Sequence, residues 1–296
     1  MRGPRKFIGS AVGHAIGAVD VFVALATAPA QIWWEVARSL SERSNAQAVA
    51  LRDANQELVR EHAIVTMLQD AMRPDPPAVP SVEIAARYLP AGRFTTVGGD
   101  WFDAFAVDDD RLIVVVGDIA GHGIGAAAAM AQVRNAIRGC AFAGLDPGRI
   151  LETVGTMLVQ TSAGLSATCV VGSLSSSTHV LTWASAGHPP PLVSHAGGDT
   201  GFLPDRPGPP LPFPGAQYRE HTHLLPPSSS LILYTDGLVE RRDEPIDVGL
   251  NRLRALAEGH GGESVQRLAN LLIEQLLRGT TPDDDVCVLV VRPISP

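Results

Sequence analysis

Residues 112–138 read LIVVVGDIAGHGIGAAAAMAQVRNAIR and contain the transition that decides the fold. Five consecutive apolar residues predict a buried strand, and Asp118 follows almost at its end. A glycine-rich turn and an alanine-rich segment come next, and the latter predicts a helix with Met130, Val133 and Ile137 on one side. A phosphate-cradling loop and a metal site both use glycines at such a turn, but only a metal site favours the carboxylate.

Composition and charge limit the class of protein. Of the 296 residues, 45% are apolar and 18% charged, which suits a packed core and excludes global disorder. The net charge of −8 and the lack of an arginine-rich stripe predict no nucleic-acid partner. Lys6 is the only lysine, so no P-loop lysine is available. Three scattered cysteines without a C-x-x-C pair indicate reduced thiols and a cytoplasmic location.

Residues 1–74 form a region of their own, which we expect to be helical. Residues 7–34 are largely apolar, but His14 and Asp20 interrupt them, so we favour an amphipathic helix that packs on protein; the alternative is contact with a membrane. Residues 35–73 follow a heptad pattern, typical either of a helix lying on its own domain or of a short coiled coil in a homodimer. The heptad positions are Leu40, Gln47, Leu51, Ala54, Leu58, Glu61, Val65, Leu68 and Met72. PDPPAVP at residues 74–80 ends this region.

Residues 81–293 mix strand and helix patterns and predict one α+β domain. Short turns join several consecutive strands, which favours antiparallel sheets with helices packed outside them. Residues 196–228 are rich in glycine and proline and predict a long irregular loop. The predicted strands span residues 82–88, 112–116, 167–174, 179–184, 191–195, 231–234 and 286–292, and the predicted helices span residues 123–138, 146–158, 250–257 and 263–278.

Aspartates recur where predicted strands meet turns. Asp100 ends GGD before a strand-like segment, Asp236 lies in TDG after LILY, and PDDD at residues 282–285 precedes VCVLVV. Such positions can converge at one end of a sheet assembly, although a single aspartate there is most often ordinary turn chemistry. Converging carboxylates would repel strongly unless cations hold them. All-oxygen ligands select Mg²⁺ or Mn²⁺, and a pair of such ions suits the hydrolysis of a phosphate ester.

The sequence resembles the PPM-type metal-dependent protein phosphatases, in their bacterial SpoIIE/RsbU-like branch. The matching segments run in family order from residue 82 to residue 292 and cover the whole C-terminal domain. They are IAARYLPAGRFTTVGGDWFDAF, VVVGDIAGHGIGAAAAMAQVRNAIRG, WASAGHPPPLV, LILYTDGLVERR and DDDVCVLVVR. The resemblance implies a four-layer α-β-β-α sandwich of two antiparallel sheets, with two Mn²⁺ or Mg²⁺ ions at its edge.

The resemblance also implies roles for individual residues. Asp118 is similar to the aspartate that bridges both metals, and the backbone carbonyl of Ile119 to a ligand of one ion. Asp100 would hold that first ion, directly or through its water. Asp236 and Asp284 would hold the other ion. We choose Asp284 over its neighbour because the family pattern is an aspartate, one polar residue and then the strand.

The implied activity is that of a protein serine/threonine phosphatase, in which a metal-bridging hydroxide attacks phosphorus in line. The implied substrate is a phosphorylated anti-sigma-factor antagonist in a partner-switching pathway. Two alternatives stay open, a catalytically dead scaffold of the same fold and a phosphatase of a small phosphoester. Ala120 replaces the general-acid histidine of eukaryotic-type enzymes, which makes His122 a candidate, although a role in the turn is favoured for it. Pro212 stands where the branch usually has glycine.

Three other motifs are weaker. Residues 121–126 satisfy G-x-G-x-x-A, but no strand ending in an acid follows, so we expect no dinucleotide site. His221 and His223 share a strand face without a third ligand nearby, so we expect a solvent-exposed pair rather than zinc. His188 in AGHPP also matches the branch, and we interpret it as structural, with substrate contact as the alternative.

Overall fold

The computed structural model describes residues 29–72, 76–91, 98–121, 123–161, 164–204, 206–279, 282 and 284–294. The chain divides into two compact units, Met1–Glu61 and His62–Pro296. The predicted helix over residues 35–73 is observed as α2 (Ala30–Met72). Along it, Leu40 and Leu51 are 60% and 74% exposed. The apolar segment predicted over residues 7–34 lies mostly outside the described residues.

Two five-stranded antiparallel sheets make up the second unit, as predicted. In one sheet the order is β1-β10-β9-β6-β7, and in the other it is β2-β3-β4-β5-β8. The first sheet contains β1 (Val82–Leu89), β10 (Val286–Pro293), β9 (Ser229–Tyr234), β6 (Leu192–His195) and β7 (Thr200–Phe202). The second contains β2 (Trp101–Ala106), β3 (Arg111–Ile119), β4 (Ala167–Ser175), β5 (Val180–Ala186) and β8 (His221–Leu224).

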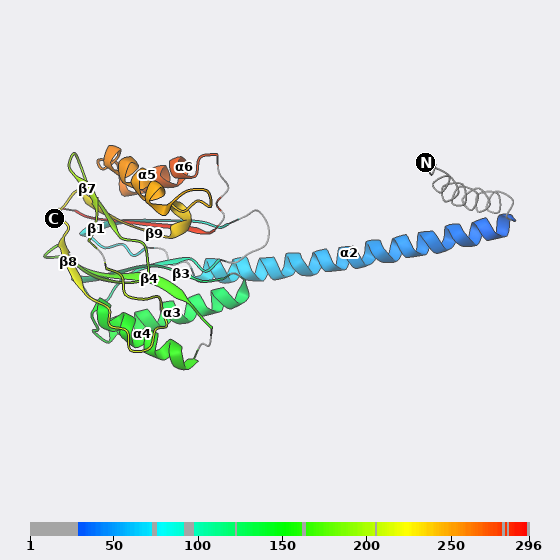
Figure 1. Ribbon diagram of the computed structural model, residues 1–296, viewed down its shortest axis with the longest axis horizontal. Helices are drawn as coiled ribbons and strands as arrows, with labels where there is room; N and C mark the ends of the chain where they lie inside the picture. The colour runs from blue at the N-terminus through cyan, green and yellow to red at the C-terminus, as the bar shows by residue number, and fades with distance from the viewer. Residues whose placement is uncertain are drawn as a thin grey trace, which may run out of the picture. The chain divides into compact units, whose positions relative to one another are not determined.

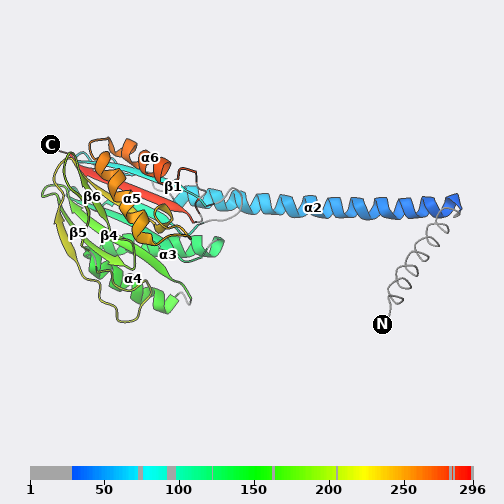
Figure 2. The ribbon, with the colours of Figure 1, turned by 45° about the horizontal axis from the view of Figure 1, so that its top comes forward.

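Helices cover the outer face of each sheet, which completes the four-layer sandwich (Figures 1 and 2). The first sheet carries α5 (Ile246–Gly259) and α6 (Val265–Leu276), and the second carries α3 (Ile124–Phe142) and α4 (Pro147–Thr161). Three buried apolar clusters fill the gaps between the four layers. The middle cluster includes Val114, Trp183 and Leu289 and joins the two sheets face to face. No helix among the described residues is both long enough and apolar enough to cross a membrane.

The predicted loop over residues 196–228 was wrong in part, because it contains β7 and β8. Each of these short strands lies at the edge of its sheet and depends on pairing with one neighbour, which local sequence does not reveal. The prediction that His221 and His223 form a solvent-exposed pair was also wrong. His221 stacks on Trp183 with ring centroids 4.9 Å apart, and the Nε2 atoms of His221 and His223 are both buried.

Candidate functional site

The four predicted aspartates lie at strand ends that meet at one end of the sandwich. Asp100 immediately precedes β2, and Asp118 lies near the end of the neighbouring β3. In the other sheet, Asp236 begins the short helix η1 (Asp236–Leu238) after β9, and Asp284 lies just before β10. Burial raises the pKa of Asp100, Asp118 and Asp236, and neighbouring charges raise it further: the charge of Asp118 acts on Asp100 and Asp236, and that of Asp284 acts on Asp118. The structure therefore brings the four carboxylates together from both sheets.

Asp100 is the most deeply buried of these acids. Its residue is only 3% exposed, and neither carboxylate oxygen forms a hydrogen bond of standard geometry. Burial raises the pKa of Asp100 well above its usual range, and the charge of Asp118 raises it further, while the nearby Thr235 hydroxyl lowers it. A buried carboxylate without partners is costly, and a cation is the natural compensation.

The Ile119 carbonyl lies beside Asp100 because of a glycine. A Cβ atom added at Gly99 would fall 2.0 Å from the Ile119 oxygen, so only glycine allows this approach. The Ile119 N–H donates to the Gly99 carbonyl at 3.2 Å. Gly98 is equally constrained, since its added Cβ would overlap the side chain of Asp285. The two glycines of GGD thus allow the start of β2 to pack closely against β3 and the segment before β10.

The choice between Asp284 and Asp285 follows from their surroundings. Asp285 is 2% exposed and accepts hydrogen bonds from the Tyr88 hydroxyl and from the Ala91 N–H, the latter at 2.6 Å. Asp284 is exposed and lines a pocket together with Asp236. The geometry therefore favours Asp284 as the ligand and makes Asp285 a buried anchor for the segment after β1.

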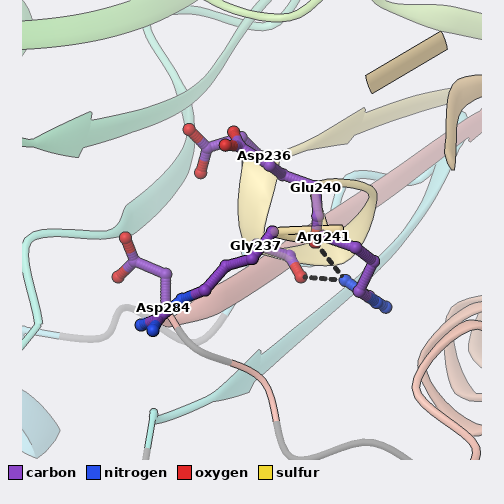
Figure 3. Close-up of a pocket in the computed structure, with 6 residues that line it drawn as sticks. Asp236, Gly237, Glu240, Arg241 and Asp284 are labelled. Atoms are coloured by element: carbon purple, nitrogen blue, oxygen red, sulfur yellow. Dashed lines mark hydrogen bonds between the residues drawn. The ribbon is translucent and has the colours of Figure 1, made fainter. Parts of the chain in front are cut away.

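The pocket has a volume of about 310 Å³ and is lined by Asp236, Gly237, Glu240, Arg241, Arg242 and Asp284 (Figure 3). Burial raises the pKa of Asp236 to about 6, with further contributions from Asp118, Asp284 and Glu240. Arg241 donates to the carbonyls of Gly237 at 3.3 Å and Leu276 at 3.0 Å, which fixes its guanidinium. Glu240 and both arginines were not predicted as site residues from the sequence, although they directly follow TDG in the segment LVERR.

The acidic set fits divalent cations that keep part of their water. Among the residues that the structure describes, no three His, Cys, Asp or Glu side chains are arranged tightly enough to hold an ion by themselves. Mg²⁺ and Mn²⁺ need few protein ligands, because waters and backbone carbonyls complete an octahedral shell. The orphaned Asp100 carboxylate and the Ile119 carbonyl beside it suit that kind of site. His122, the candidate general acid, lies outside the described residues.

Comparison with known proteins points to one family. The family model described as Stage II sporulation protein E (SpoIIE) matches residues 108–293, more than half of the chain. The phosphoserine phosphatase RsbU of Bacillus subtilis (strain 168) is 25% identical over 247 residues, which cover 82% of this chain and 72% of RsbU.

Solved structures show the same fold. The RsbU and RsbW domains of Rv1364c from Mycobacterium tuberculosis give a TM-score of 0.69 at 37% identity over 74% of this chain; the match spans 62% of that chain's length. The catalytic domain of the serine threonine protein phosphatase PstP, in complex with two manganese ions, gives a TM-score of 0.52 at 16% identity over 73% of this chain and 99% of that one. At 16% identity, the similarity to PstP shows a shared fold alone. The chain belongs to the SpoIIE family of PPM-type protein serine/threonine phosphatases.

Proposed function

We propose that this phosphatase hydrolyses phosphoserine or phosphothreonine on a small anti-sigma-factor antagonist, with two Mn²⁺ or Mg²⁺ ions at the acidic end of the sandwich. The observation that carries the proposal is the convergence of Asp100, Asp118, Asp236 and Asp284, with both Asp100 oxygens buried and without a hydrogen bond of standard geometry. The similarity to RsbU, a phosphoserine phosphatase, supports the substrate class.

In this proposal each protein group has a separate task. Asp118, at the centre of the cluster, would contact both ions, and Asp100 with the Ile119 carbonyl would complete the protein contribution to one of them. Asp236 and Asp284 would hold the second ion at the mouth of the pocket. The ions would neutralise the phosphoryl oxygens and supply an activated water at neutral pH. Arg242 lines the same pocket, so it places a positive charge beside the position proposed for the phosphoryl group.

Mn²⁺-dependent hydrolysis of a phosphoserine peptide and of p-nitrophenyl phosphate tests the proposal. We expect Asp118→Asn and Asp236→Asn each to lower kcat/KM at least about 100-fold, because metal ions contribute several kcal/mol of transition-state stabilisation. Asp243→Asn serves as the control, because Asp243 is an exposed aspartate that does not line the pocket. Turnover without metal, or full activity in both variants, would overturn the mechanism.

Activity and binding measurements together separate the phosphatase from the scaffold and from a small-phosphoester hydrolase. An inactive wild type that binds Mn²⁺ would indicate a scaffold. Activity on small phosphoesters without activity on phosphopeptides would indicate a small-molecule substrate. Capture of a phosphorylated antagonist by the metal-free protein, followed by its release when Mn²⁺ is added, would support the partner-switching role.

We also propose that residues 35–73 form a homodimer through a coiled coil. The heptad residues Leu40 and Leu51 are exposed on α2, which leaves apolar surface for a second copy. Removal of residues 1–74 is expected to convert a dimer into a monomer in light scattering, and Leu51→Glu is expected to weaken the dimer. Val49 is 54% exposed and off the heptad, so Val49→Glu is the matched control. An unchanged mass after truncation would reject the dimer.

A further inference from the structure

His188 lies where the chain crosses from one sheet to the other. It belongs to the connection between β5 and β6, which are strands of different sheets. Its residue is only 3% exposed, and it does not line the pocket. A buried imidazole at this crossing has no access to substrate, so it can act only through the residues to which it is hydrogen-bonded.

Two hydrogen bonds define the state of the His188 ring. Its Nε2 lies 3.0 Å from the carbonyl oxygen of Tyr234, and its Nδ1 lies 2.9 Å from the hydroxyl of Thr168. A carbonyl can only accept, so Nε2 carries the hydrogen. Burial lowers the pKa of His188 to about 4, which keeps the ring neutral at physiological pH. The Nδ1 atom therefore accepts, and the Thr168 hydroxyl donates to it.

One end of this bridge is tied to the Asp236 side of the site. Tyr234 is the last residue of β9 and lies two residues before Asp236. The Tyr234 hydroxyl in turn donates to the Pro190 carbonyl at 3.0 Å, so the crossing and the end of β9 are bonded in both directions. These bonds fix the end of β9, from which the TDG turn begins.

The other end is tied to the Asp118 side. Thr168 is paired with Asp118 across β4 and β3, so the two side chains share one face of the sheet. Val116 and Val170, the next residues on that face, belong to the cluster between the sheets. Thr168 has one hydroxyl hydrogen, and because it goes to His188, it is not donated to the carboxylate of Asp118. The bridge thereby keeps the Thr168 hydroxyl from occupying a lone pair of Asp118.

We infer that His188 is a positioning residue, which holds the ends of β4 and β9 at the separation that lets Asp118 and Asp236, from different sheets, bind one pair of ions. The inference rests on the proposed function, because it assigns a role in the metal site proposed above. Beyond that function, His188 receives a role, a tautomer and two hydrogen-bond partners, Thr168 and Tyr234. Groups that orient metal ligands without touching the metal commonly change metal affinity 10- to 100-fold.

The test measures Mn²⁺ binding directly, through the EPR signal of unbound Mn²⁺ during titration of the full chain. His188→Gln retains an amide donor that can reach the Tyr234 carbonyl, and His188→Asn retains an acceptor near Thr168. We expect each to weaken Mn²⁺ binding at least about 10-fold, because each keeps only one end of the bridge. We expect Thr168→Val to weaken Mn²⁺ binding to a similar extent. Thr168→Ser keeps the hydroxyl and is expected to bind Mn²⁺ as the wild type does.

A stability control separates positioning from general damage. Ser194 is fully buried and donates to the Ala257 carbonyl at 3.0 Å, and it lies on β6 outside the acidic cluster. Ser194→Ala is expected to lower the melting temperature without changing the Mn²⁺ dissociation constant. Wild-type affinity in both His188 variants, or an equal loss in Ser194→Ala, would overturn the inference while leaving the metal site intact. A wild type that binds no Mn²⁺ would instead overturn the proposed function and this inference with it.

Discussion

At the scale of single residues, the chain places charge where the folded state penalises it. Asp100 is buried without a hydrogen-bond partner, and Asp236 is partly buried among other acids. Such an arrangement destabilises the metal-free protein and is typical of residues retained for function rather than for stability.

Replacement of Asp100 tests this cost. In EDTA at pH 8, we expect Asp100→Asn to stabilise the protein by about 1–3 kcal/mol, because the amide avoids the cost of burying this carboxyl group beside Asp118. The same variant is expected to lose the stabilisation that Mn²⁺ gives to the wild type. Urea unfolding with and without Mn²⁺ measures both effects. Destabilisation of the metal-free protein by the substitution would contradict the electrostatic argument.

The pH dependence of metal-free stability tests Asp236. Its pKa rises from 3.8 to about 6 on folding, so the folded state binds the proton more tightly than the unfolded state. The contribution of Asp236 to the free energy of unfolding therefore falls by about 1–3 kcal/mol in total as pH rises from about 4 to about 6. Above that pH it stays constant.

The measurement compares the wild type with Asp236→Asn in EDTA between pH 4 and 7.5. The difference isolates Asp236 from His188, whose pKa of about 4 gives a contribution of opposite sign over the same range. A difference in unfolding free energy that does not change with pH would show that Asp236 is not buried among charges as described.

At the scale of elements, a buried ion pair joins β2 to α3. Asp103, 1% exposed, accepts from Arg134 at 3.1 Å and from two nitrogens of Arg138 at 2.6 and 2.7 Å. The two arginines are one turn apart on the helix, and Arg138 also lies 4.5 Å from the centre of the Phe105 ring. The hydrogen bond with Asp103 raises the pKa of Arg138. The helix after the GHG turn is thereby anchored to β2, the strand that directly follows Asp100.

Loss of this anchor is expected to be costly. Asp103→Asn should destabilise the domain by about 2–4 kcal/mol, because it leaves two partly buried guanidinium groups without their counter-charge. Asp109→Asn, at an exposed position after the same strand, should change stability by less than about 0.5 kcal/mol. Chemical denaturation of both variants in EDTA measures the difference. Equal stability would contradict the role of Asp103.

At the scale of the molecule, the acidic cluster draws on both sheets, which the apolar cluster between them already joins. A metal held by both sheets should stabilise them as one unit. At 100 times its dissociation constant, Mn²⁺ is expected to add about 2.7 kcal/mol for each ion bound and to raise the melting temperature while residues 76–294 unfold in one transition.

Calorimetry checks this expectation, with Asp118→Asn as the variant in which the shift should disappear. Two separate transitions in the presence of Mn²⁺, or a shift that persists in Asp118→Asn, would show that the ions do not join the two sheets.

Local sequence determined much of this molecule. The alternation and length of apolar runs predicted eleven strands and helices of the C-terminal domain within a few residues, for example β10 at residues 286–292 and α4 at residues 146–158, because buried strands and amphipathic helices carry their own periodicity. The four aspartates were identifiable as a set, because aspartates recur where predicted strands meet turns and the resemblance then assigned their roles. The resemblance of the motifs then supplied the four-layer arrangement, which no single segment specifies.

Tertiary structure decided what depends on distant partners. Only the contacts with Tyr88 and Ala91 distinguish Asp285 from Asp284, since the two are adjacent and chemically identical. Likewise the edge strand β8 exists because it pairs with β5, and His188 gains a function from Thr168 and Tyr234, which are 20 and 46 residues away. The physical reason is the same in each case: burial and hydrogen bonding are set by what packs against a residue, and neighbours along the chain do not determine them.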